Sequence, residues 1–211
     1  MSTEDLIRRL AADGADPRRS TPGLRMALML PLALGGSALM VAEILGVRPD
    51  LPLYMLSDAG ALKFFGGAST AIAGTCIAAA LARPVPPRRL CVLAFSLLAA
   101  VVVAGAVLVT TADVTAPLVA SARGALRCVW PILPLAALPM FISLLSLRAG
   151  ASTHPILTGA AAGLASGAIG AMSYAFWCPA DDLMLVALGY GIALIATTGI
   201  GAAIGARILI W

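Results

Sequence analysis

Six long apolar segments, more than any other feature, constrain what this chain can fold into. A helix needs roughly 20 mostly apolar residues to cross about 30 Å of hydrocarbon, and each of the six reaches that length. They are too long and too continuously apolar for the alternating strands of about ten residues that build closed membrane barrels. The sequence therefore predicts an all-α integral membrane protein, a bundle of six transmembrane helices. The expected spans are approximately Met26–Leu45, Leu62–Ala82, Leu90–Thr111, Leu126–Leu147, Ile156–Trp177 and Leu183–Ile208.

Composition supports this prediction. The chain has 211 residues, of which 61% are hydrophobic and 11% are charged, whereas soluble domains average about 45–50% apolar and about 25% charged residues. There are too few polar residues to cover a soluble domain, which argues against a cytosolic enzyme, a nucleic-acid-binding fold and a disordered chain. We divide the chain into an N-terminal segment, residues 1–25, and a transmembrane domain, residues 26–211.

The distribution of basic residues predicts the orientation, because cytoplasmic segments of membrane proteins carry an excess of Lys and Arg. If the N-terminus is inside, the outer segments hold only Arg48, Lys63, Arg123 and Arg127. Both termini are therefore expected in the cytoplasm. The cytoplasmic segments would then hold Arg8, Arg9, Arg18, Arg19, Arg25, Arg83, Arg88, Arg89, Arg148 and Arg207.

The N-terminal segment begins with a short amphipathic pattern. Ser2 or Thr3 can cap a helix, and the following acidic residues suit its positive end. Such a helix could rest on the anionic inner leaflet, or it could fold into a groove on a cytosolic partner. Its acidic opening favours the partner. The residues concerned are Asp5, Leu6, Ile7 and Leu10.

No catalytic set is visible in the sequence. The single histidine, His154, has no second imidazole with which to share a metal, so histidine-based metal sites are not expected, and we expect no cofactor. Glu43 is the only acidic residue within the expected spans, and we expect it to pair with Arg48 or Lys63 near the outer end of its helix. This scarcity of intramembrane charge argues against a proton-coupled transporter.

Two of the four cysteines stand out by position. Cys128 begins the fourth span and Cys178 closes the fifth, and helices of these lengths would bring both thiols to a similar height on the outer face. The pair could form a disulfide or a soft-metal site, with Arg127 favouring the thiolate of Cys128, although the shared height could be coincidence. Cys76 and Cys91 lie near the cytoplasmic ends of their spans and are expected to be small buried hydrophobes.

Small residues and prolines mark the last three spans. Gly159, Gly163 and Gly167 in the fifth, with Gly201 and Gly205 in the sixth, allow close approach of helix backbones. Packing inside the bundle is favoured over dimerisation. The fourth span carries three prolines, which disfavour a straight helix and make it a candidate moving part, static packing being the alternative. They are Pro131, Pro134 and Pro139.

Taken together, several short motifs resemble the NrsF family of bacterial membrane anti-sigma factors. The similarity extends over essentially the whole chain, although the tail has one arginine before Trp211 where the family often has two basic residues. The motifs are Asp5-Leu6-Ile7 with Leu10, Leu45-Gly46-Val47-Arg48-Pro49-Asp50, Arg127-Cys128, Cys178-Pro179 and the tail from Arg207 to Trp211.

The resemblance implies a regulator of the bacterial inner membrane. Such a protein would hold an extracytoplasmic-function sigma factor at the bilayer and release it under oxidative or heavy-metal stress. It would not be an enzyme, and would bind neither nucleic acid directly nor a small-molecule substrate. The matching positions imply signal sensing at Cys128 and Cys178. Partner binding would fall to Asp5, Leu6, Ile7 and Leu10.

Two other functions stay open at this stage. A quinone-linked thiol/disulfide redox enzyme would need a second cysteine pair on the same outer side, but Cys76 and Cys91 face the other way. A small channel or carrier would need polar residues along a path or discontinuous helices, and only the proline-rich fourth span suggests one.

Overall fold

The computed structural model describes residues 3–5, 7, 22–111, 118–150 and 152–209, and within these ranges it contains helices and no strands. Six helices of this part are long and apolar enough to cross a membrane, which confirms the all-α class and the six long helices. Their insertion into a membrane stays a prediction. The side of a membrane on which each end lies stays a prediction. The elements are α2 (Pro22–Ile44), α3 (Leu51–Tyr54), α4 (Asp58–Ala61), the π-helical turn η1 (Leu62–Gly66), α5 (Gly67–Leu81), α6 (Arg88–Thr111), α7 (Leu118–Leu147), α8 (Pro155–Ala175) and α9 (Leu183–Ile208).

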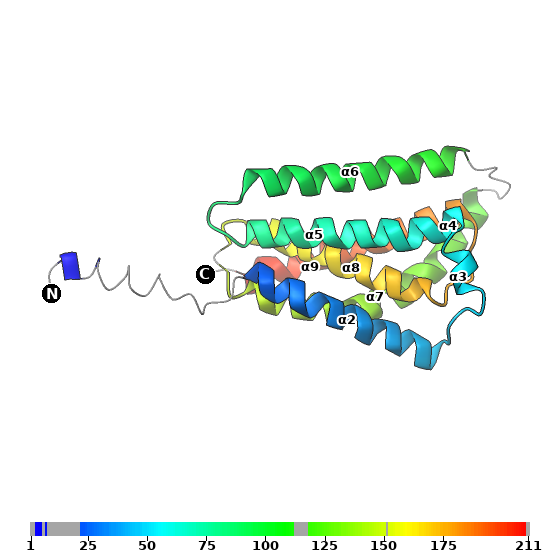
Figure 1. Cartoon of the computed structure of the whole chain (residues 1–211), viewed down its shortest axis with the longest axis horizontal. Helices are drawn as coiled ribbons and strands as arrows, with labels where there is room; N and C mark the ends of the chain where they lie inside the picture. The colour runs from blue at the N-terminus through cyan, green and yellow to red at the C-terminus, as the bar shows by residue number, and fades with distance from the viewer. Residues whose placement is uncertain (1–2, 6, 8–21, 112–117, 151, 210–211) are drawn as a thin grey trace.

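The long helices run back and forth, so the bundle has two ends (Figure 1). We call the end that holds Cys128 and Cys178 the cysteine end. The opposite end is called the arginine end. Its arginines are exposed and include Arg83, Arg88, Arg148 and Arg207.

The second span begins earlier than the sequence predicts. It starts at Asp58 rather than Leu62, because Ser57 caps it: the Ser57 hydroxyl accepts a hydrogen bond from the Gly60 N–H at 3.1 Å. From this cap, α4, η1 and α5 continue without a break. The helix that holds the fourth span begins earlier, at Leu118, although its apolar span begins at Gly124, near the expected Leu126, and the three prolines lie inside this one continuous helix.

Helix α8 forms the centre of the bundle, and 72% of its most apolar stretch is buried. Its glycines face those of α9. A methyl group added at Gly201 would lie 2.7 Å from the Cα of Gly163, and one at Gly205 would lie 2.7 Å from the Cα of Gly159. The predicted packing of these small residues within the bundle is therefore confirmed.

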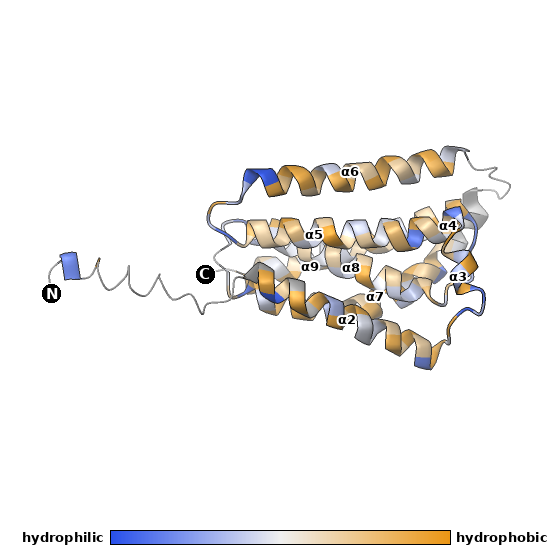
Figure 2. Cartoon of the chain, in the orientation of Figure 1, coloured by the Kyte–Doolittle hydropathy of each residue, from blue (hydrophilic) through white to orange (hydrophobic). Residues whose placement is uncertain are grey.

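Helix α6 lies at the edge and packs mainly along α5 (Figure 1). Only 6% of its most apolar stretch is buried. Figure 2 shows that most residues of α6 and of the other long helices are apolar, and the exposed residues of α6 include Val92, Leu93 and Val102. Apolar surface of this extent suits hydrocarbon rather than water.

Candidate functional site

The structure brings Cys128 and Cys178 together at the cysteine end. Cys128 lies in α7, and Cys178 follows the last turn of α8. Both are free thiols, exposed by only 3% and 1%, and they share one core cluster with Tyr174 and Tyr190. The helix lengths thus predicted the right neighbours, while the sensing role stays a hypothesis.

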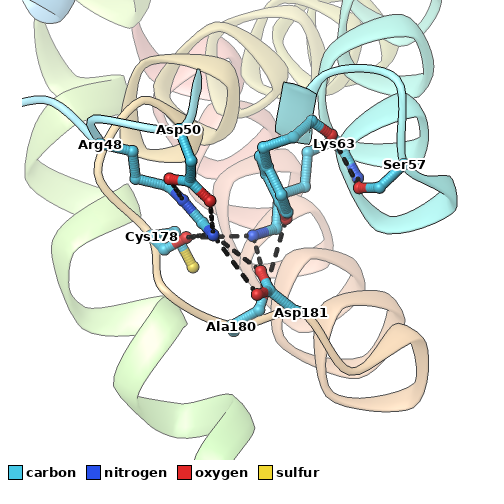
Figure 3. Close-up of polar contacts among 9 residues, drawn as sticks. Arg48, Asp50, Ser57, Lys63, Cys178, Ala180 and Asp181 are labelled. Atoms are coloured by element: carbon cyan, nitrogen blue, oxygen red, sulfur yellow. Dashed lines mark hydrogen bonds and ion pairs between the residues drawn. The ribbon is translucent and has the colours of Figure 1, made fainter. Parts of the chain in front are cut away.

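A buried lysine lies against the same sulfur pair. Lys63 is on the π-helical turn η1, and its side chain is 1% exposed. Its Nζ donates to the carbonyl oxygen of Ala180 at 2.6 Å and to that of Cys178 at 3.4 Å (Figure 3). The ring centroids of Tyr54 and Tyr190 lie 4.9 and 5.9 Å from Nζ. Lys63 is thus a buried cation at the cysteine end, while its expected place in an outer segment stays a prediction.

Arg48 fixes the connection that carries Cys178. Its Nη1 donates to Asp181 Oδ1 at 2.8 Å and to the Cys178 carbonyl at 3.2 Å, and its Nε and Nη2 bind both oxygens of Asp50 (Figure 3). The guanidinium also stacks on Tyr54, 3.9 Å from the ring centroid. The hydrogen bonds to Arg48 hold the pKa of Asp50 below its usual range. We call Arg48, Asp50, Tyr54 and Asp181 the Arg48 latch.

The expected pairing of Glu43 with Arg48 or Lys63 is wrong. Glu43 is exposed, Arg48 forms its ion pairs with Asp50 and Asp181, and Lys63 points to backbone carbonyls of the connection between α8 and α9. The chain reverses direction after α2 and folds α3 over the bundle end, which brings these cations to the α8–α9 connection.

The surroundings of Cys178 favour its thiolate. The neighbouring Cys128 thiol lowers the pKa of Cys178, and the Lys63 ammonium and the Ala180 backbone lower it further, against the opposing effect of burial. Arg127, the expected cation, is exposed, and the cation beside the sulfurs is Lys63. The structure therefore gives no support to the expected action of Arg127 on Cys128.

The remaining cysteines lie toward the arginine end, on α5 and near the start of α6. Cys76 and Cys91 are partly buried, and Cys76 packs against the core cluster that includes Ile77 and Leu147. This agrees with their expected role as small hydrophobes. Among the described residues, no group of three or more His, Cys, Asp or Glu side chains is placed to hold a metal ion.

The structure describes only part of the expected docking motif. Asp5 and Ile7 are exposed. Leu6 and Leu10, together with most of the N-terminal segment, lie outside the described residues.

Sequence reasoning missed Lys63 and the Arg48 latch as members of this site. A usable signal existed for Lys63, since a lone basic residue at the start of a long apolar helix is costly unless it has a partner. The Arg48–Asp181 pair had no comparable signal, because its residues are far apart in the sequence.

Comparisons with known proteins find relatives of a single family, and the similarity extends over the whole chain. A family model described as "Negative regulator of sigma F" (NrsF) matches residues 10–211. The "Anti-sigma-F factor NrsF" of Caulobacter vibrioides is 33% identical over 214 residues, covering 100% of both chains. The "Probable anti-sigma-F factor NrsF" of Azospira oryzae is 28% identical over 216 residues, again covering 100% of both. No solved structure matches the chain.

Proposed function

This chain belongs to the NrsF family of negative regulators of sigma F, and on that premise we propose that it is an inner-membrane anti-sigma factor that senses stress through its sulfur pair. It binds an extracytoplasmic-function sigma factor at the cytoplasmic face. Oxidation of Cys128 and Cys178, or capture of a soft metal ion by them, then releases the partner. The observation that carries the sensing part is that these two thiols are free, buried and part of one core cluster.

The chemistry of the pair suits a switch. A disulfide would join the two sulfurs by a covalent S–S bond of about 2.05 Å with a fixed dihedral angle. A soft metal ion would draw two thiolates to itself and displace their protons. Either event ties α7 to the end of α8 at the cysteine end.

The two helices offer a physical route to the other end of the bundle. α7 and α8 pack along one another from the cysteine end to the arginine end. A change that favours the released state over the bound state by about 2.7 kcal/mol weakens partner affinity a hundredfold. A shift in the packing of one helix pair is enough to supply such a difference.

The proposed partner-binding region is the N-terminal segment with Asp5, Leu6, Ile7 and Leu10, aided by the connection between α5 and α6. That connection is well exposed at the arginine end, where Arg83 and Arg88 carry positive charge and Val85 is 82% exposed. An exposed apolar residue between cations suits a protein surface with acidic and apolar groups.

A pull-down from detergent-solubilised membranes tests the binding function. The full-length protein should retain the sigma factor, and a variant lacking Met1–Asp13 should lose it. Ile7→Asp should reduce recovery at least tenfold because it places a charge on the apolar stripe, whereas the matched control Ile7→Val should not. Equal recovery with and without the N-terminal residues would contradict the proposed docking segment, and absence of any sigma factor with the intact protein would contradict the function.

The thiol/disulfide enzyme considered from the sequence gains no support from the fold. Exchange of a disulfide with a second pair requires the two pairs to meet, whereas Cys76 and Cys91 lie toward the arginine end. The binding function therefore stands as the proposal.

A further inference from the structure

We propose that a cavity beside α6 binds a free long-chain fatty acid from the membrane. Its carboxylate pairs with Lys63 at the cysteine end, and its hydrocarbon chain lies between α6 and α9. This site adds a ligand to the protein, and it depends neither on the sulfur pair nor on the binding of a sigma factor.

The cavity has a volume of about 520 Å³, and its lining comes from η1, α5, α6, α8 and α9. This volume is in the range of about 300–1,000 Å³ that is usual for small-molecule sites. The lining is almost entirely apolar and includes Gly66, Gly105 and Gly191. A methyl group added at Gly191 would meet no atom within 4 Å. Because apolar cavities stay free of water and take apolar ligands, the occupant has to be mainly hydrocarbon.

The length of the cavity matches one leaflet of a bilayer. Along α6 its lining extends from Val101 to Thr110. This stretch is about 14 Å long at the rise of an α-helix, close to half of a hydrocarbon core that is about 30 Å thick. Because α6 runs antiparallel to α5 (Figure 1), Thr110 lies toward the cysteine end, as Lys63 does. The cavity therefore fits one hydrocarbon chain that enters from the leaflet at the cysteine end.

The bound chain has a structural role for α6. Only 6% of the most apolar stretch of this helix is buried, and the helix packs mainly along α5. A chain that fills the space between α6 and α9 gives the edge helix a second packing partner.

Charge complementarity defines the head group. Lys63 lines the cavity and is 1% exposed. An ammonium has three N–H donors, and Nζ directs two of them to the carbonyl oxygens of Cys178 and Ala180. The ion pairs among the described residues engage Arg48 rather than Lys63. A buried ammonium without an anion costs considerable free energy, and a ligand carboxylate supplies that anion to the remaining donor.

A second donor belongs to the same lining. Tyr190 on α9 is 8% exposed, and its hydroxyl has no hydrogen-bond partner among the described residues. Its ring centroid is 5.9 Å from Nζ of Lys63, so the hydroxyl and the ammonium belong to the same end of the cavity. A carboxylate has two oxygens that accept several hydrogen bonds, and it can take one from each donor. The unpartnered hydroxyl thus favours the same head group, independently of the charge of Lys63.

Other membrane molecules fit these observations less well. A phospholipid brings a second chain and a larger head group to a cation that is almost completely buried. An isoprenoid quinone or a long-chain alcohol suits the apolar lining but carries no negative charge for Lys63. Among these molecules, the fatty acid supplies both a single chain and a compact anion.

Photo-cross-linking of the full-length protein in phospholipid nanodiscs tests the site. The probe is palmitate with a diazirine near its terminal methyl group, and mass spectrometry of the peptides locates the cross-links. We expect them near Val101 on α6 and Leu194 on α9, the lining residues of these helices that are farthest from the cysteine end. Excess palmitate should reduce them at least about tenfold, because a buried charge pair contributes strongly to binding. Excess hexadecanol, which has the same chain length and no charge, should not.

Two glycines of α9 provide a test of the chain position and its matched control. Gly191→Leu places a side chain in the cavity and should reduce cross-linking at least about tenfold through direct steric exclusion. Gly199→Leu makes the same change where a methyl group also meets nothing within 4 Å, but Gly199 does not belong to the lining. The control should cross-link like the wild type.

Substitution of Lys63 tests the head group. Lys63→Gln keeps a donor for the carbonyl oxygens but removes the ammonium, and should weaken competition by palmitate at least about tenfold. Lys63→Arg keeps the charge and should preserve the competition.

Two results with the wild-type protein would overturn the proposal, and neither needs a variant to fold. One is cross-linking that excess palmitate does not suppress, and the other is equal suppression by hexadecanol. Equal cross-linking of folded Gly191→Leu and Gly199→Leu would also overturn it, as would a folded Lys63→Gln protein that binds palmitate like the wild type.

Discussion

Arg48 and Asp181 join two connections that are remote in sequence, with Arg48 Nη1 lying 2.8 Å from Asp181 Oδ1. One connection follows α2 and the other precedes α9, and Cys178 lies between α8 and this ion pair. Because the same guanidinium also binds the Cys178 carbonyl, the position of the sulfur depends on the Arg48 latch.

Removal of the latch should therefore loosen the sulfur site. We expect Arg48→Gln to lower the thermal midpoint by a few degrees, roughly what a loss of 1–2 kcal/mol produces in a chain of this size, and to speed alkylation of Cys178. Arg48→Lys should not rescue either property, since an ammonium cannot bind two carboxylates in the planar geometry of a guanidinium. Unchanged alkylation of Cys178 in Arg48→Gln would contradict the role given to the latch.

Acid should weaken the same latch through Asp50. Its folded-state pKa is lowered by Arg48, so its stabilising contribution is complete above the unfolded-state pKa of about 3.9 and is lost as pH falls through the lower folded-state value. The difference in thermal midpoint between the wild-type protein and Asp50→Asn should stay constant near neutral pH and shrink below about pH 4. In an Arg48→Gln background the difference should be small at every pH. A difference that persists in strong acid would count against this linkage.

The glycine contact between α8 and α9 should tolerate no side chain. Gly201→Ala would bring a methyl group within 2.7 Å of the Gly163 Cα, whereas a methyl group at Gly199 meets nothing within 4 Å. We expect Gly201→Ala to lower the free energy of unfolding by about 1–3 kcal/mol. Gly199→Ala, two residues away on the same helix, should be neutral or slightly stabilising because alanine favours helix. Equal effects of the two substitutions, measured in the same detergent, would show that the helices do not pack as described.

The sulfur pair should be needed for release and not for binding. In cells that carry Cys128→Ser with Cys178→Ser, the sigma factor should stay in the membrane fraction after addition of a peroxide or a soft metal ion. The variant with Cys76→Ser and Cys91→Ser should release it like the wild type. Normal release from the first variant would remove the sensing hypothesis while leaving the binding function intact.

Labelling of intact cells tests the orientation of the bundle. Leu56, at the cysteine end, and Val85, at the arginine end, are 84% and 82% exposed. Cysteines introduced at these two positions should therefore differ in labelling only because they lie on different sides of the membrane. A membrane-impermeant maleimide should label Leu56→Cys from outside, and Val85→Cys only after lysis. The reverse pattern would show that the predicted orientation is inverted.

The architecture was predictable because lipid imposes a length on every span. The last span matches its predicted ends, Leu183–Ile208, and the counted lengths of the fourth and fifth spans brought Cys128 and Cys178 to one height. Such counting places residues along the membrane normal only. It does not tell which helices are neighbours or which way a side chain points.

The parts that sequence could not supply are those that depend on lateral packing. The latch requires the connection after α2 to lie against the connection before α9, which follows from the order of helices around α8. The burial of Lys63 follows from the short helices α3 and α4 folding over the end of the bundle, and a hydropathy pattern does not detect elements of four residues.

The π-helical turn at Leu62–Gly66 has one further effect, on helical phase. A turn of this kind holds an additional residue, and in a helix of 3.6 residues per turn one residue corresponds to a rotation of about 100°. The direction in which Lys63 points around the helix axis is thus set separately from that of Gly67 and Gly74, which contact α8 farther along the same continuous helix. Deletion of one residue from this turn would give a continuous α-helix. That helix could place Lys63 against Cys178 or pack Gly67 and Gly74 against α8, but not both.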